Sequence, residues 1–194
     1  MSDQILCIAA IILLGFGVIT RDSLEEGFRC VDRKFFVPTV RCSCSTAKVL
    51  IRVLTQPFLP YTPSCSNKGN EALAHSDQPL KEGNVHISAP HIYGSALQEL
   101  DLIPNSSTSF LNIGSGTGYV SSIAAQILGP NALNYGVELH DDVIDHCKAS
   151  LGKWKSSTIE QVKDDVSIVH FMDDNIADIQ SKLLAHMLVR VVFY

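Results

Sequence analysis

The pattern of apolar and polar residues predicts a parallel α/β core in the second half of the chain. A short apolar run, Phe110 to Ile113, is typical of a buried parallel strand. It ends at a glycine-rich turn, and the apolar periodicity of Val120 to Leu128 predicts a helix directly after that turn. A second strand is predicted from Asn134 to Leu139, followed by a helix that Asp141 or Asp142 caps and that runs to about Leu151. This order indicates the first half of an open, parallel sheet.

The N-terminal half carries a weaker pattern. Apolar residues at near-helical spacing between Ser23 and Pro38 predict an amphipathic helix, and Ser23 with Glu26 fits a capping box. Farther along, Val85 and Ile87 alternate with polar residues, which predicts a short strand or an extended turn. A helix is then predicted from about Ile92 to Leu100.

Two segments stand apart from these elements. Residues 1–22 contain an uncharged run of 15 residues, Ile5 to Ile19, which is shorter than the roughly 20 residues that span a bilayer. A buried core helix or an irregular terminus is the favoured interpretation, and a signal peptide or an anchor is the alternative. Residues 39–70 are rich in proline and small polar residues, so we expect an irregular insertion there.

Composition narrows the classes of function. The 194 residues suffice for one domain, and a net charge of −5 with scattered Lys and Arg gives no basic face for nucleic acid or for an anionic membrane. The six cysteines lack the spacing of a disulfide framework or a zinc site. We therefore expect reduced cysteines, no metal, no nucleic-acid partner, no membrane association and a cytoplasmic location.

The glycine-rich turn and the second strand together indicate a ligand. A turn of the form G-x-G-x-G between a strand and a helix brings backbone N–H groups close to a polar ligand, although a plain surface turn is the alternative. Glu138 lies 20 positions beyond Gly118, where an acid at the tip of the second strand accepts the hydroxyls of a ribose. The combination favours a nucleoside ligand. Ser88 and His86 lie on a segment just upstream where a substrate could meet it, although on spacing alone a structural or solvent-facing role is the favoured alternative for both.

Two motifs carry a family resemblance: Val85-His-Ile-Ser-Ala-Pro-His91 and Phe110-Leu-Asn-Ile-Gly-Ser-Gly-Thr-Gly118. Through them the chain resembles the protein-L-isoaspartate O-methyltransferases, within the class I S-adenosylmethionine-dependent methyltransferases. The first motif is rather specific to that family, and the second is shared by many methyltransferases. The stretch 134–139 looks closest to the branch called isoaspartate methyltransferase domain-containing proteins. The resemblance covers about 24–38 and 71–178, and it implies an α/β fold, a Rossmann-like methyltransferase sheet with flanking helices.

The resemblance also implies roles for particular residues. Ser88 would be the catalytic residue that binds the isoaspartyl carboxylate. The substrate pocket would be formed by its neighbours Ile87, Ala89, Pro90 and His91. The cofactor, S-adenosyl-L-methionine, would be held by the glycine turn and the end of the second strand, namely Gly114, Ser115, Gly116, Thr117, Gly118, Glu138, Leu139 and His140. A third strand is predicted over 167–171, and Asp173 or Asp174 after it would lie near the adenine amino group.

The implied activity is methyl transfer from S-adenosylmethionine to isoaspartyl carboxylates in damaged proteins, which is a repair reaction. The sequence supplies three strands, or four if 188–194 is one, which is fewer than a complete methyltransferase sheet has. Residues 23–194 are therefore expected to form a partial methyltransferase domain, truncated after the third or fourth strand. Two alternatives stay open: a non-catalytic, cofactor-binding adaptor with ubiquitin-ligase partners, and an inactive fragment.

Overall fold

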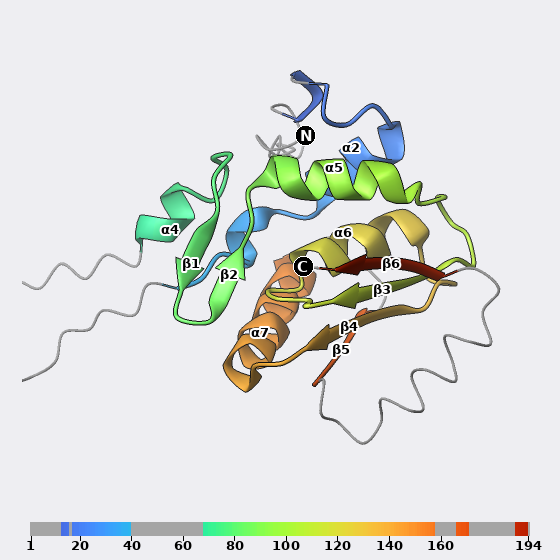
Figure 1. Cartoon of the computed structure of the whole chain (residues 1–194). Helices are drawn as coiled ribbons and strands as arrows, with labels where there is room; N and C mark the ends of the chain where they lie inside the picture. The colour runs from blue at the N-terminus through green and yellow to red at the C-terminus, as the bar shows by residue number, and fades with distance from the viewer. Residues whose placement is uncertain (1–12, 16, 40–67, 158–165, 171–188, 194) are drawn as a thin grey trace, which may run out of the picture.

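A parallel four-stranded sheet organises the second half of the chain. The computed structural model describes residues 13–15, 17–39, 68–157, 166–170 and 189–193 (Figure 1). The sheet has the strand order β5-β4-β3-β6. Its bounds are Ser109–Ile113 for β3, Asn134–Glu138 for β4, Val166–His170 for β5 and Val189–Phe193 for β6. All three strand pairs are parallel, so the predicted α/β class and all four predicted strands are confirmed.

The order of the strands creates a place for a ligand. From β3 the chain steps to β4 and then to β5 on one side, whereas β6 pairs with the opposite edge of β3. Ile113 at the end of β3 is in register with Val137 of β4 and with Phe193 of β6. The carboxyl ends of the strands therefore meet at one edge, and open α/β sheets bind ligands at this edge, where the strand order reverses.

Helices α6 (Tyr119–Leu128) and α7 (Asp141–Ser157) follow β3 and β4, as the periodicity predicts. Helix α6 is buried over most of its surface because α2 (Asp22–Cys30) packs on the side that faces away from the sheet (Figure 1). Helix α7 continues past its predicted end, because Trp154 is buried and its indole N–H donates to the Cys30 carbonyl at 3.1 Å.

The prediction of one helix from Ser23 to Pro38 is wrong beyond Cys30. At Val31 the backbone turns extended, and a 3₁₀ turn, η1 (Arg33–Phe35), begins where the Asp32 carboxylate accepts from the Lys34 N–H at 3.0 Å. The break allows Phe36 to enter the core, where its ring lies 5.4 Å from that of Tyr119. The predicted capping box is also absent, since α2 has no side-chain cap at its N-terminus.

A small hairpin and a helix lie beside the sheet and lead into it. After α4 (Lys68–Ala72), strands β1 (Leu80–Glu82) and β2 (Val85–Ile87) pair in antiparallel fashion across a two-residue loop, Gly83-Asn84. Helix α5 (Pro90–Leu100) starts two residues earlier than expected. Strand β2 was one of the predicted options, whereas β1 was not predicted. Residues 40–67, most of the expected insertion, lie outside the described residues.

The described part of the N-terminal apolar run packs on α5. Leu13 and Ile19 are buried, and both lie against Gly94, where an added Cβ would come within 3.3 Å of each. Residues 1–12 lie outside the described residues. Within the part of the chain that the structure describes, no helix combines the length and the apolar character that crossing a membrane requires.

Candidate functional site

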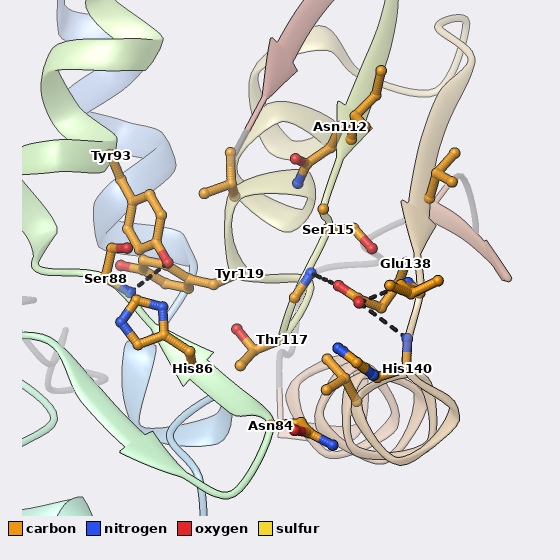
Figure 2. Close-up of a pocket in the computed structure, with 17 residues that line it drawn as sticks. Asn84, His86, Ser88, Tyr93, Asn112, Ser115, Thr117, Tyr119, Glu138 and His140 are labelled. Atoms are coloured by element: carbon orange, nitrogen blue, oxygen red, sulfur yellow. Dashed lines mark hydrogen bonds between the residues drawn. The ribbon is translucent and has the colours of Figure 1, made fainter. Parts of the chain in front are cut away.

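A cavity of about 490 Å³ opens at the carboxyl ends of β3 and β4, within the size range of small-molecule sites. One wall is formed by the glycine turn after β3 and by the end of β4, and the opposite wall by the β1–β2 hairpin and the start of α5 (Figure 2). The cavity thus joins the two motifs of the sequence, which begin 25 positions apart along the chain, at Val85 and Phe110.

The glycine turn has a backbone that favours glycine. Gly114, Gly116 and Gly118 have φ values of 78°, 55° and 82°, all in the left-handed region that other residues rarely adopt. Gly118 also caps α6 and lies so close to α7 that an added Cβ would fall 2.4 Å from the Cys147 sulfur. The turn therefore brings its backbone to the cavity and allows the N-terminus of α6 to lie close to Cys147 of α7.

The carboxylate of Glu138 is fixed by three backbone donors. One oxygen accepts from the Gly116 N–H at 2.9 Å, and the other accepts from the N–H groups of Leu139 at 2.7 Å and His140 at 3.2 Å. Only 8% of Glu138 is exposed, and it lines the cavity. A carboxylate offers about four acceptor positions, so about one is left for a ligand. Two ribose hydroxyls would have to share or replace one of these backbone bonds.

Two polar oxygens in the cavity wall have no partner among the described residues. They are Ser115 Oγ and Asn112 Oδ1, and both are buried. The other amide atom of Asn112, Nδ2, donates to Ser121 Oγ at 3.1 Å, which fixes the side chain. Buried polar atoms are nearly always paired, so unpaired ones in a cavity wall mark the positions where a polar ligand fits.

The hairpin side of the cavity presents Ser88, His86 and Tyr93 (Figure 2). The Ser88 N–H donates to the hydroxyl of Tyr93 at 2.6 Å, and the Tyr93 ring lies edge-on to that of Tyr119 at 5.8 Å. The pKa of His86 is lowered by burial, by Lys81 and by Arg33, in that order, so its imidazole is neutral at pH 7. This wall therefore offers hydroxyl and neutral imidazole groups, with no carboxylate among them.

The structure places the predicted site residues as follows. Ser88, Leu139, His140 and four residues of the glycine turn, Gly114 to Thr117, line the cavity with Glu138. Gly118 does not line it and lies instead against Cys147 of α7. Ile87, Ala89 and Pro90 are buried behind Ser88 and do not reach the cavity wall. His91 is exposed and turned away, since its backbone N–H and Nδ1 both bond the Asp77 carboxylate at 3.0 Å. Asp173 and Asp174 lie outside the described residues.

Several lining residues were not among the predicted set. Asn112 stands two positions before the first glycine, and its polar side chain within an apolar strand was a signal that could have marked it. Tyr93 and Tyr119 resemble ordinary core aromatics in the sequence. Asn84 belongs to the hairpin loop, and its amide donates to the Asp142 carboxylate at 3.2 and 3.3 Å. The hairpin tip is thus linked to the start of α7 beside the cavity.

The fold and the site define a class: a Rossmann-like domain with the glycine turn and acid of a nucleoside-binding protein. The model of the family Protein-L-isoaspartate(D-aspartate) O-methyltransferase (PCMT) matches residues 63–173, more than half of the chain. The chain therefore belongs to the protein-L-isoaspartate O-methyltransferase family, as the resemblance implied.

Curated relatives agree with this assignment. The chain is 28% identical over 124 residues to a protein-L-isoaspartate O-methyltransferase of Triticum aestivum, an alignment that covers 63% of this chain and 40% of the relative. It is 30% identical over 127 residues to protein-L-isoaspartate O-methyltransferase 1 of Arabidopsis thaliana, and this alignment covers 65% of this chain and 42% of the relative. It is 34% identical over 82 residues to the protein-L-isoaspartate O-methyltransferase of Aeropyrum pernix, and this alignment covers 42% of this chain and 31% of the relative. The chain spans less than half the length of these relatives.

Solved structures show the same fold. A structure from Plasmodium falciparum described as a protein-L-isoaspartate O-methyltransferase, in complex with S-adenosyl-L-homocysteine, superposes with a TM-score of 0.59 at 17% identity. That match covers 92% of this chain and 66% of the other. A second protein-L-isoaspartate O-methyltransferase gives a TM-score of 0.54 at 17% identity, and the match covers 84% of this chain and 40% of the other. At this identity the likeness concerns the fold alone.

Proposed function

We propose that the chain binds S-adenosyl-L-methionine in the cavity and transfers its methyl group to the carboxylate of isoaspartyl residues in proteins. The observation that carries this proposal is the single cavity shared by the glycine turn, the Glu138 carboxylate and Ser88. Family membership supports it, and so does the neighbour from Plasmodium falciparum, whose complex contains S-adenosyl-L-homocysteine.

The sheet side of the cavity fits the cofactor. The glycine turn and Glu138 would hold its ribose, and the unpartnered oxygens of Ser115 and Asn112 would accept hydrogen bonds from its polar groups. Leu139, whose exposed fraction is 57%, and His140 would lie against the adenine. When bound, the cofactor supplies a methyl group activated by a sulfonium sulfur.

The hairpin side fits the substrate. An isoaspartyl carboxylate has a pKa near 4 and is ionised at neutral pH, so its oxygen is nucleophilic without a general base. The work of the protein is then alignment and exclusion of water. The Ser88 hydroxyl would donate to one carboxylate oxygen and orient the other. The buried rings of Tyr93 and Tyr119 keep water away from that end of the cavity.

A methyl-transfer assay tests the proposal. The chain is incubated with methyl-labelled S-adenosylmethionine and either an isoaspartyl peptide or the same peptide with normal aspartate. We expect label in the isoaspartyl peptide only. Because a hydrogen bond to a charged group is worth about 1.5–3 kcal/mol, Ser88→Ala should lower kcat/KM by about tenfold or more. Its affinity for the cofactor should stay at the wild-type value.

The matched control is Ser95→Ala, on the exposed face of α5, which should leave both quantities unchanged. Equal labelling of the two peptides would contradict the substrate assignment, and so would an equal loss of cofactor affinity in Ser88→Ala. Cofactor binding without any labelled product would contradict the enzymatic proposal and favour the adaptor.

A further inference from the structure

Arg33 is wholly buried and lies beside the substrate side of the cavity. Its guanidinium donates to the carbonyls of Ala74 at 2.7 Å, Gln78 at 3.0 Å and Ser88 at 3.0 Å, with a longer contact to the Ser76 carbonyl at 3.4 Å. A buried charge is costly unless its donors are paired, and the planar, five-donor guanidinium is suited to joining several acceptors at fixed angles. One side chain of η1 thus joins residues 74–78 to Ser88, between β2 and α5.

The backbone of Ser88 is held from both sides. Its carbonyl accepts from Arg33, and its N–H donates to the Tyr93 hydroxyl at 2.6 Å. Tyr93 is itself fixed, because its ring is buried against Tyr119. With both polar backbone groups bonded, the rotation about χ1 is the freedom that the serine hydroxyl retains.

The charge of Arg33 also acts on the cavity wall. Burial raises the pKa of Tyr93, whereas its hydrogen bond with Ser88 and the positive charge of Arg33 lower it. Arg33 contributes likewise, after burial and Lys81, to the lowered pKa of His86. Both effects indicate a positive potential at the end of the cavity where an anionic carboxylate would bind.

We propose that Arg33 is a positioning residue that, together with Tyr93, fixes Ser88 in the orientation required to bind the substrate carboxylate. This inference rests on the proposed function, because it gives Arg33 and Tyr93 a role in binding the substrate and none in binding the cofactor. Arg33 does not itself line the cavity and acts on it through Ser88, which does.

The test uses Tyr93→Phe and Arg33→Lys in the full chain. Phenylalanine keeps the ring and removes the acceptor of the Ser88 N–H, whereas lysine keeps the charge and loses the planar fork. The first readout is hydrogen exchange of the Ser88 amide, measured by NMR without cofactor or substrate. We expect exchange about three- to tenfold faster in both variants, as expected for the loss of one hydrogen bond.

The second readout is the kinetics of transfer to the isoaspartyl peptide. We expect kcat/KM to fall about three- to tenfold, with the Kd for S-adenosylhomocysteine within about twofold of the wild-type value. Tyr135→Phe on β4 and Arg29→Lys on α2 are the matched controls, and both should behave like the wild-type chain.

Three results would overturn the positioning role. They are a Ser88 amide that exchanges at the wild-type rate in both variants, a kcat/KM that does not change, and a cofactor affinity that falls as much as kcat/KM. The proposed function is tested separately: if the wild-type chain transfers no methyl group, that proposal is wrong. The amide exchange then still decides whether Arg33 and Tyr93 hold Ser88.

Discussion

Replacing Gly118 by alanine tests the packing that supports the glycine turn. Two costs add at this position. The φ of 82° is in the left-handed region, where alanine is less stable by about 1–2 kcal/mol. The added Cβ would also lie 2.4 Å from the Cys147 sulfur, well inside van der Waals contact, so the start of α6 and Cys147 must move apart. Overpacking of this kind costs about 1–3 kcal/mol.

We therefore expect Gly118→Ala to lower the free energy of unfolding by about 2–5 kcal/mol, a large part of the roughly 5–15 kcal/mol that keeps a domain folded. The melting temperature should fall by about 4–20 °C for a chain of this length. Urea denaturation followed by circular dichroism measures the free energy directly.

Gly116→Ala is the matched control for this prediction. Its φ of 55° carries a similar backbone cost, but its added Cβ would meet only the carbonyl oxygens of His86 at 3.6 Å and Gly114 at 3.9 Å, which are ordinary contacts. It should therefore lose only about 1–2 kcal/mol.

Removing the sulfur isolates the steric part of the cost. In a Cys147→Ala background, the nearest atoms to the alanine at 118 are the Leu151 Cγ at 3.8 Å and the Cβ of residue 147 at 3.9 Å. Gly118→Ala should then cost about 1–3 kcal/mol less than it does in the wild-type background. Equal losses for the two glycines, with no coupling between Gly118 and Cys147, would refute the reasoning.

Three further predictions concern buried groups. Glu138→Gln should weaken S-adenosylmethionine binding and lower the free energy of unfolding by about 1–3 kcal/mol, because an amide nitrogen would face a backbone N–H. Calorimetry measures both quantities, and values equal to those of the exposed control Glu99→Gln would contradict this prediction. Burial raises the pKa of Cys147 to about 12, so alkylation of this thiol at pH 8 should be far slower in the native chain than in urea. Mass spectrometry measures the two rates, and equal rates would contradict the burial of Cys147. Burial lowers the pKa of His146, against the opposing effect of its bond to the Phe36 carbonyl, so the unfolded chain binds more protons. Stability should be fully present above about pH 6.5 and fall as the pH drops below it. The slope should be smaller in His146→Gln, with His86 contributing part of the remainder, and an unchanged slope would exclude His146 as a cause.

Local patterns predicted the sheet because its elements obey local rules. A buried apolar run, a glycine turn and a helix with 3.6-residue periodicity determine β3 and α6 without reference to distant residues. The break at Val31 was missed because it depends on tertiary contacts: Arg33 bonds carbonyls more than 40 residues away, and Phe36 packs on Tyr119. Strand β1 was missed because it contains one apolar residue, Leu80, and so shows no alternation, whereas β2 of the same length has two.

The site also contains a part that follows local rules and a part that depends on tertiary contacts. The glycine turn and Glu138 belong to one strand–helix–strand unit, so their spacing alone indicated that they meet. The substrate side depends on how the hairpin packs, and the sequence did not show that Tyr93 turns back to bond Ser88 or that Asn84 reaches Asp142. The interpretation of residues 87–91 as one pocket also overlooked helix geometry, since α5 begins at Pro90 and turns His91 toward Asp77.

The central claim is that the cavity at the glycine turn binds S-adenosylmethionine. Isothermal titration calorimetry of the chain, with its fold checked by circular dichroism, tests it directly. We predict one-to-one binding that is lost in Gly116→Val, because valine cannot adopt a φ of 55° without strain, and retained in Gly152→Val, where an added Cβ meets open space. A folded chain that gives no binding heat at millimolar cofactor, or a Gly116→Val variant that binds as the wild-type chain does, would contradict the claim.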